Sequence, residues 1–175
     1  WVNMLKVKAS YGSQGNDKIG DYRYVDTYRL ASSNGEMSVA FLEKGNPNIT
    51  WETNTNFNAG IEFGVLQNRI SGSIEYFNRK TTDMLMAFPT APSLGYSSYY
   101  ANVGDMSNKG IEVDLNFTPI RSKNVQWDIN VNLTHLKNKI ISLPPERRTK
   151  EVEGYYGYAG SSFFYGQGLP LYTFH

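Results

Sequence analysis

Apolar and polar residues alternate in five separate stretches of this chain, and this alternation constrains the fold more than any other feature. A period of two places successive side chains on opposite faces of a β-sheet. The stretches are Leu5 to Tyr11, Thr55 to Phe63, Ile70 to Asn78, Ile111 to Phe117 and Trp127 to His135. We therefore expect an all-β chain of about five antiparallel strands, each with one apolar and one polar face.

The two faces predicted for these strands differ sharply in chemistry. Apolar side chains form one set: Leu5, Val7, Ala9, Phe57, Ala59, Ile61, Ile74, Tyr76, Val113, Leu115, Ile129 and Val131. Acids and amides mark the opposite face: Glu62, Glu75, Glu112, Asp114, Asp128 and Asn130. A lipid-facing apolar side and a wet lumen produce this division in transmembrane barrels. A soluble β-sandwich would show the same alternation, but the many acids and amides favour a wet lumen, which we expect the second set to face.

The connections between the stretches alternate between short and long. Gly64 to Arg69 and Thr118 to Gln126 are short, whereas Gly12 to Asn54, Arg79 to Lys109 and the chain after Leu136 are long. Ordinary domains seldom contain structureless loops above ~15 residues. Outer-membrane barrels have short periplasmic turns and long extracellular loops, and their tilted strands need ~9–11 residues to cross. The pattern favours an antiparallel transmembrane β-barrel segment with long extracellular loops.

The two short turns also predict a strand register. Folding at the first turn sets Phe63 near Ile70, and folding at the second sets Phe117 near Trp127. Both registers pair apolar residues with apolar residues, as a sheet with one buried face requires. Phe63, Phe117 and Trp127 would then lie beside the short turns, as an aromatic girdle at a membrane interface does.

Three residues are expected to mark strand boundaries. Pro47 has no N–H to donate to a ladder and should lie outside a strand. Gly104 and Gly110 lie where the second long connection returns to the sheet. We expect a positive φ or a β-bulge at these glycines, unless they are ordinary loop glycines.

Composition excludes several classes of protein. The 175 residues include no cysteine, which excludes a disulfide scaffold, a zinc ribbon and a thiol nucleophile. A net charge of +1 gives no reason to expect nucleic acid as a partner. No apolar run reaches the ~18 residues of a membrane-spanning helix. The low hydropathy makes a soluble protein the first expectation, but it does not exclude a barrel, because only alternate barrel residues meet lipid.

Catalytic motifs are weak, and we expect no catalytic site, metal or cofactor. His135 and His175 are the two histidines, and neither has a metal-ligand spacing such as H-E-x-x-H. No G-x-S-x-G nucleophile elbow occurs. Glu112 and Asp114 share a strand face, as a glycosidase pair could. Alternating acids along a polar lumen are the simpler interpretation of that spacing.

Several segments resemble SusC/RagA-type TonB-linked outer-membrane proteins. Residues 45–52 (GNPNITWE) and 58–64 (NAGIEFG) are similar to the family's GNPNLKWE and NxGLDFG stretches. Further similar segments follow in the family's order: residues 68–85, 102–112, 127–134 and 168–171, with residues 5–12 before them. In the long connection after Leu136, Pro144 to Arg148 and the tyrosines that follow match no family segment.

The resemblance implies a barrel of about 22 strands closed by a plug. Residues 1–175 would all belong to the barrel domain, with the plug and TonB box outside them, in a parent several times this length. It implies import of an oligosaccharide or oligopeptide across the outer membrane, with a SusD-like surface lipoprotein and periplasmic TonB as partners. A soluble all-β carbohydrate-binding module or adhesin is the alternative. The barrel should need detergent for purification, whereas the module should not.

Tyrosines concentrate in the long connections, where they are candidates for substrate binding. Tyrosine offers a large amphipathic surface at low entropic cost, so it can stack on sugar rings or grip peptides. Packing between loops or against the lipoprotein is the alternative. The candidates are Tyr22, Tyr24, Tyr28, Tyr96, Tyr99, Tyr100, Tyr155, Tyr156 and Tyr158, with Phe163, Phe164 and Tyr165 in the same third group.

Overall fold

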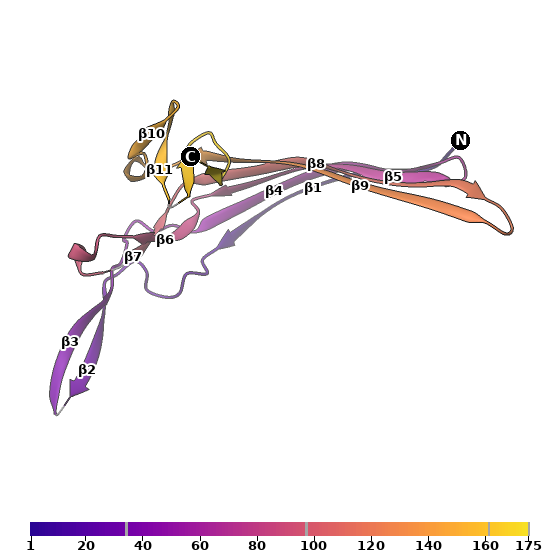
Figure 1. Ribbon diagram of the computed structural model, residues 1–175. Coiled ribbons are helices and arrows are strands. Elements are labelled where there is room, and N and C mark those ends of the chain that lie inside the picture. Colours follow the sequence, from indigo (N-terminus) through magenta and orange to yellow (C-terminus); the bar gives the residue numbers. More distant parts are fainter. Residues whose placement is uncertain (34, 97, 161, 175) are drawn as a thin grey trace.

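The computed structural model describes residues 1–33, 35–96, 98–160 and 162–174. Its main body is one antiparallel sheet, drawn edge-on in Figure 1, with strand order β1-β4-β5-β8-β9. The strands are β1 (Val2–Asn16), β4 (Glu52–Val65), β5 (Ile70–Thr82), β8 (Asp105–Arg121) and β9 (Gln126–Ser142). Each of the five alternating stretches forms one of these strands, which confirms the predicted all-β antiparallel architecture.

The strands are longer than the alternation indicates. They contain from 13 residues in β5 to 17 in β8 and β9. At ~3.4 Å per residue, the two longest extend well beyond the ~25 Å apolar band of an outer-membrane barrel, even when tilted. The alternation ends earlier than the strands do, because beyond it the strands contact the connections, as at the outer end of β9, where Ile140 is only 2% exposed.

At the first short turn, the register differs by two residues from the predicted one. Phe63 pairs with Gly72 instead of Ile70, and Ile70 pairs with Val65. β4 runs on to Val65, so only residues 66–69 remain for the turn. Three consecutive turn residues have left-handed backbone: Leu66, Gln67 and Asn68. A shift of two residues keeps every side chain on its predicted face.

At the second short turn, the register shifts in the same direction. Phe117 pairs with Ile129 instead of Trp127, and Trp127 pairs with Ile120. The irregularity between Phe117 and Ile120 contains Pro119, which cannot donate to the ladder and is accommodated by a bulge. β8 and β9 therefore extend further towards the turn than the sequence pattern predicts.

The observed register places the predicted apolar set on one face of the sheet. One cross-strand row on this face joins Val7, Ile61, Ile74, Val113 and Leu133. Residues directly opposite each other in a sheet point to the same side. Val7 is 79% exposed and Leu133 is 60% exposed, so nothing in the described residues covers this face. An apolar face of this extent is the expected surface for contact with lipid.

The long connections contain short strands of their own, which the sequence pattern did not predict. The first contains the hairpin β2 (Thr27–Ser33) and β3 (Glu36–Glu43). The second contains β6 (Leu85–Pro89), η1 (Pro92–Leu94) and β7 (Ser98–Asn102). The third contains η2 (Pro145–Arg147), β10 (Lys150–Val152), β11 (Tyr155–Ala159), β12 (Phe163–Gly166) and β13 (Thr173–Phe174). All three lie at the end opposite the N-terminus (Figure 1).

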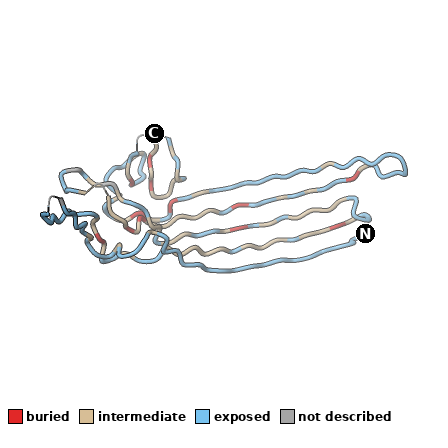
Figure 2. Tube along the Cα trace, turned by 90° about the horizontal axis from the view of Figure 1, so that it is seen from below, coloured by how far each residue is buried: buried red, intermediate tan, exposed pale blue. Residues whose placement is uncertain are grey.

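Most buried side chains lie where these connections meet the sheet. Val103, Ile140, Leu143 and Phe164 are each 6% exposed or less. Figure 2 shows few buried positions along the rest of the long strands, because a single layer covers neither of its own faces. Among the described residues, no helix is long and apolar enough to span a membrane.

The predicted boundary residues behave differently from one another. Pro47 lies between β3 and β4, outside both strands, as expected. Gly104 has a φ of 120° and directly precedes a bulge between Asp105 and Met106, which confirms its predicted role. Gly110 lies within regular β8 and has neither feature, so the expectation for this residue is wrong. It is buried beneath the ring of Phe77.

Candidate functional site

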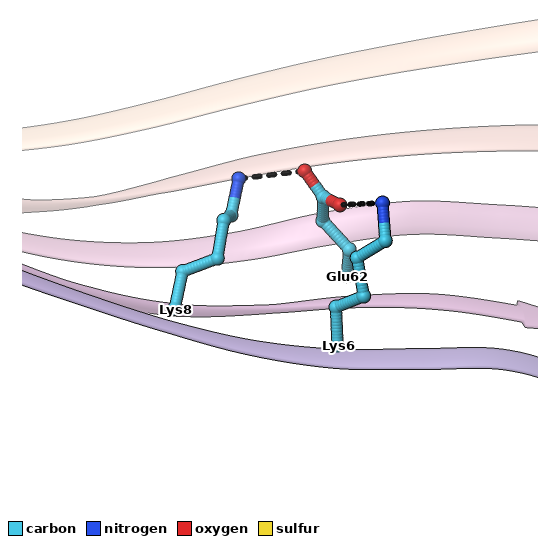
Figure 3. Close-up of polar contacts among 3 residues, drawn as sticks. All are labelled: Lys6, Lys8 and Glu62. Atoms are coloured by element: carbon cyan, nitrogen blue, oxygen red, sulfur yellow. Dashed lines mark hydrogen bonds and ion pairs between the residues drawn. The ribbon is translucent and has the colours of Figure 1, made fainter.

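The polar face of the sheet contains an ordered charge cluster near its β1 edge. Lys6 and Lys8 are two residues apart and share a face of β1, where they flank Glu62 of β4 (Figure 3). The Lys8 Nζ lies 2.6 Å from Glu62 Oε1, and the Lys6 Nζ lies 3.6 Å from Oε2. These pairs are solvent-exposed, so they contribute to the charge pattern of the face more than to stability.

The remaining predicted lumen residues share this polar face. Glu75 of β5 pairs with Glu112 of β8, and Asp114 lies two residues further along β8. Like charges directly opposite each other are destabilising, so this part of the face favours cationic or strongly hydrated neighbours. That the face borders a lumen remains a prediction.

Asp128 and Asn130 continue the same face along β9 towards the second short turn. The carboxylate of Asp128 accepts hydrogen bonds from Thr118 Oγ1 at 2.6 Å and Gln126 Nε2 at 2.7 Å. Asn130 pairs with Asn116 of β8. Asp128 thus links Thr118, which lies in the proline bulge of β8, to Gln126 at the start of β9, and so helps to fix the strands beside the turn.

Rings from the first two connections meet in an aromatic cluster. Tyr28 of β2 packs edge-on against Phe41 of β3 at 5.5 Å, and Phe41 lies 5.9 Å from Tyr96. Tyr96 contacts Tyr99 at 6.4 Å, and Tyr99 contacts Phe88 at 5.5 Å. The structure therefore brings three predicted tyrosines together, in contacts that join two connections to each other.

Tyr22 and Tyr24 line a cavity of about 590 Å³ at the base of the first connection. Its walls also contain Asp17, Lys18 and Trp51. Aromatic faces interleaved with charged groups suit a polar ligand, because rings stack on sugar faces while charges bind hydroxyls.

Arg23 organises the wall of this cavity. Its Nε donates a hydrogen bond to Ile19 O at 2.6 Å, and its guanidinium forms an ion pair with Glu43. The guanidinium also lies 4.7 Å from the ring centre of Tyr100, another predicted tyrosine. Tyr100 is therefore engaged in a cation–π contact at the junction of the first two connections.

The third connection places its tyrosines in two environments. Tyr155 and Tyr156 are 40% and 52% exposed, and a hydrogen bond with Glu151 raises the pKa of Tyr156. Tyr158 stacks on Tyr165 at 4.9 Å, and burial raises the pKa of Tyr158. Tyr158 lines a second cavity of about 320 Å³.

Arg147 lines the same second cavity, and the sequence motifs do not identify it. It lies in the Pro144 to Arg148 region that matches no family segment. The one feature of the sequence that could have indicated Arg147 is the basic pair Arg147-Arg148 in a tyrosine-rich connection. Such basic pairs are common on protein surfaces. Only folding brings Arg147 against rings from two different connections, as the contacts of its guanidinium show.

The described residues contain no group of three or more His, Cys, Asp and Glu side chains that could hold a metal ion. His135 lies on the apolar face, opposite Ile111. His175 lies outside the described residues.

An open antiparallel sheet with an uncovered apolar face, short turns at one end and long structured connections at the other defines the wall of an outer-membrane β-barrel. Comparison with known proteins agrees with this class. The chain belongs to the family described as TonB dependent receptor-like, beta-barrel, whose model matches residues 2–170. Members of this family are receptors and transporters of the outer membrane, and this chain is accordingly an outer-membrane β-barrel chain.

Individual relatives agree with the family assignment. TonB-dependent receptor P26 of Formosa agariphila is 30% identical over 97% of this chain, and TonB-dependent receptor SusC of Bacteroides thetaiotaomicron is 31% identical over 79%. Among solved structures, the RagAB peptide importer in its closed-closed state matches with a TM-score of 0.81 and 28% identity over 97% of the chain. The chain spans 18% of P26, 15% of SusC and 18% of the RagAB chain.

Proposed function

We propose that this chain is part of the barrel wall of a TonB-dependent transporter that imports an oligosaccharide or oligopeptide across the outer membrane. In this proposal, residues 1–175 belong to the barrel domain, and the plug and TonB box lie outside them. The observation that supports it most strongly is the membership of residues 2–170 in the receptor barrel family. The chain binds and passes a substrate, and it breaks no bond.

The structured connections support substrate capture at one end of the barrel. Two cavities, of about 590 and 320 Å³, lie among them. Both fall within the ~300–1,000 Å³ range of small-molecule sites. The nine predicted tyrosines all lie in these connections, so the same end would meet the substrate first. The solved RagAB relatives are named as peptide transporters and importers.

A SusD-like surface lipoprotein and periplasmic TonB are the proposed partners. The hairpin β2–β3 favours contact with the lipoprotein at the outer end, because one face of the hairpin is almost wholly apolar. Leu30, Met37 and Val39 on that face are 65%, 73% and 67% exposed. An isolated two-stranded hairpin is marginally stable in water, so contact with a partner would stabilise it.

A soluble carbohydrate-binding module or adhesin is the alternative function. A soluble module would bury one side of its sheet. Here the apolar face includes Val7 at 79% exposure and Leu133 at 60% exposure. That uncovered face favours the membrane barrel.

Uptake by living cells tests the proposed function. Cells that express the full-length protein should accumulate labelled oligosaccharides or oligopeptides, and accumulation should stop when TonB is deleted or the proton gradient is dissipated. Deleting residues 28–42 should reduce uptake while the barrel still reaches the outer membrane. Uptake that is unchanged without TonB would refute energised import.

A further inference from the structure

The cavity of about 320 Å³ is enclosed by parts of the chain that are distant in sequence. Its apolar walls come from the second connection, the end of β9 and the third connection: Met86, Val103, Ile140, Leu143, Tyr165 and Leu171. Ile140 lies on the polar face of β9, as Asn138 does. The cavity is therefore on the side of the sheet where the proposed lumen lies.

Hydrogen bonds fix the third connection over this position. Gly168 N donates to Ile140 O at 2.8 Å, and Ile140 N donates to Leu169 O at 2.9 Å. Leu171 N donates to Asn138 Oδ1 at 2.8 Å. These bonds turn the chain back onto the end of β9, so the cavity wall is built by the backbone and does not depend on side-chain contacts alone.

One cation faces this apolar space. The Arg147 guanidinium lies 3.1 Å from the ring centre of Phe88 and 4.7 Å from that of Tyr158. Its Nε is buried and has no hydrogen-bond acceptor within the described part of the chain. No carboxylate of those residues forms an ion pair with it. Burial lowers the pKa of Arg147, yet an arginine stays charged at neutral pH.

A guanidinium that lines an apolar cavity without a carboxylate partner among the described residues favours an anionic ligand, and a carboxylate is the group that best satisfies it. We propose that this cavity binds the C-terminal carboxylate of a peptide whose last side chain is apolar, with Arg147 as the carboxylate-binding residue. The proposal rests on the proposed import function and names the substrate class. The aliphatic and methionine residues of the walls suit an apolar side chain, and the polar groups of the lining are the Arg147 guanidinium and the hydroxyls of three tyrosines: Tyr158, Tyr165 and Tyr172.

Paired peptides test this assignment with the purified full-length protein in detergent. The probes are an N-acetylated tetrapeptide that ends in leucine with a free carboxylate, the same peptide with a C-terminal amide, and a version that ends in glycine. Calorimetry should show at least tenfold tighter binding of the free acid than of the amide or the glycine peptide. Arg147→Gln should weaken the acid to the level of the amide. Lys150→Gln removes an exposed charge from the same connection and should change nothing.

Retained binding of the amide by Arg147→Gln would show that the cavity is intact. Arg147→Lys should recover part of the preference for the acid, because it restores the charge without the planar fork. Equal affinity of the native protein for acid and amide would overturn the proposal, as would an unchanged preference in Arg147→Gln. The transport function is tested separately, by uptake in cells that express the native full-length protein. If these cells import an uncharged oligosaccharide, the transport function holds whatever the peptide-binding result. If they import neither oligosaccharides nor oligopeptides, the transport function is refuted.

Discussion

At the residue scale, Gly110 shows how a glycine can be required without a positive φ. A Cβ built on Gly110 would overlap the backbone oxygen of His135 on β9 and lie 2.8 Å from the ring of Phe77. Phe77 is only 6% exposed, because its ring lies across the neighbouring strand where Gly110 leaves room. Glycine in a strand interior often marks such a close approach.

Gly110→Ala should therefore destabilise the barrel. We expect a loss of about 1–3 kcal/mol, because the added methyl overpacks a site bounded by backbone. Urea titration of the full-length protein folded into lipid vesicles would measure it. Gly12→Ala is the matched control, since no atom lies within 4 Å of a Cβ at Gly12. Equal stabilities of the two variants would show that the space at Gly110 is not needed.

At the element scale, each long strand combines a membrane-crossing segment with an extension. Two aromatic groups lie on the apolar face. Phe57 and Tyr76, 6.4 Å apart, form one group, and Phe63, Phe117 and Trp127 lie nearer the short turns. Six residues separate Phe57 from Phe63, or ~20 Å of strand, which approaches the ~25 Å apolar band. The group beside the short turns is the single girdle that the sequence predicts, which stays a prediction, and Phe57 with Tyr76 would form a second girdle at the other boundary of the bilayer.

Arginine scanning of β8 tests the face assignment of the strands. Val113→Arg should impair folding into lipid by ~2–4 kcal/mol if it lies near the midplane, because a cation on the lipid face loses its hydration. Asp114→Arg should be tolerated, since Asp114 lies on the opposite, polar face of β8 beside Glu75 and Glu112. Folding yields in vesicles would separate the two variants. A larger loss for Asp114→Arg would reverse the faces.

At the scale of the whole molecule, the two ends of the sheet are different. The N-terminus and the turns at residues 66–69 and 122–125 lie at one end, and the three structured connections lie at the other (Figures 1 and 2). Outer-membrane barrels keep short turns in the periplasm. We therefore expect the connections to reach the cell exterior, where the substrate and the lipoprotein arrive.

Single cysteines test this orientation, because the chain has no cysteine of its own. Cysteines at Ser32, Ser98 and Ser162 should react with a membrane-impermeant maleimide on intact cells, whereas one at Ser122 should react only after the outer membrane is broken. The lipoprotein should protect Ser32 if it covers the β2–β3 hairpin, so labelling with and without it provides the control. Labelling at Ser122 alone would reverse the orientation.

The sequence by itself determined the number of main strands, the residues on each face and the end at which the connections lie. These properties follow from local alternation and from spacing along the chain, which folding does not change. The apolar set from Leu5 to Val131 occupies one face in the structure as predicted. The backbone conformation at Gly104 and the position of Pro47 outside a strand could also be predicted, because tolerance of a positive φ and the lack of an N–H are properties of single residues.

Only the tertiary structure decided the register, the strand ends and the cavity at Arg147. A slip of two residues leaves every apolar side chain on the same face, so alternation cannot distinguish Phe63 opposite Ile70 from Phe63 opposite Gly72. The outer ends of the long strands contact the connections instead of lipid, as Ile140 of β9 does, so the period of two stops before the strands end. In β3, Met37, Val39 and Phe41 do alternate, but this short stretch lies within a long connection and was not predicted as a strand. Arg147 acquires its place from Tyr158 of its own connection and from Phe88 of the second connection, which is far away in sequence, and such a long-range contact leaves no local pattern.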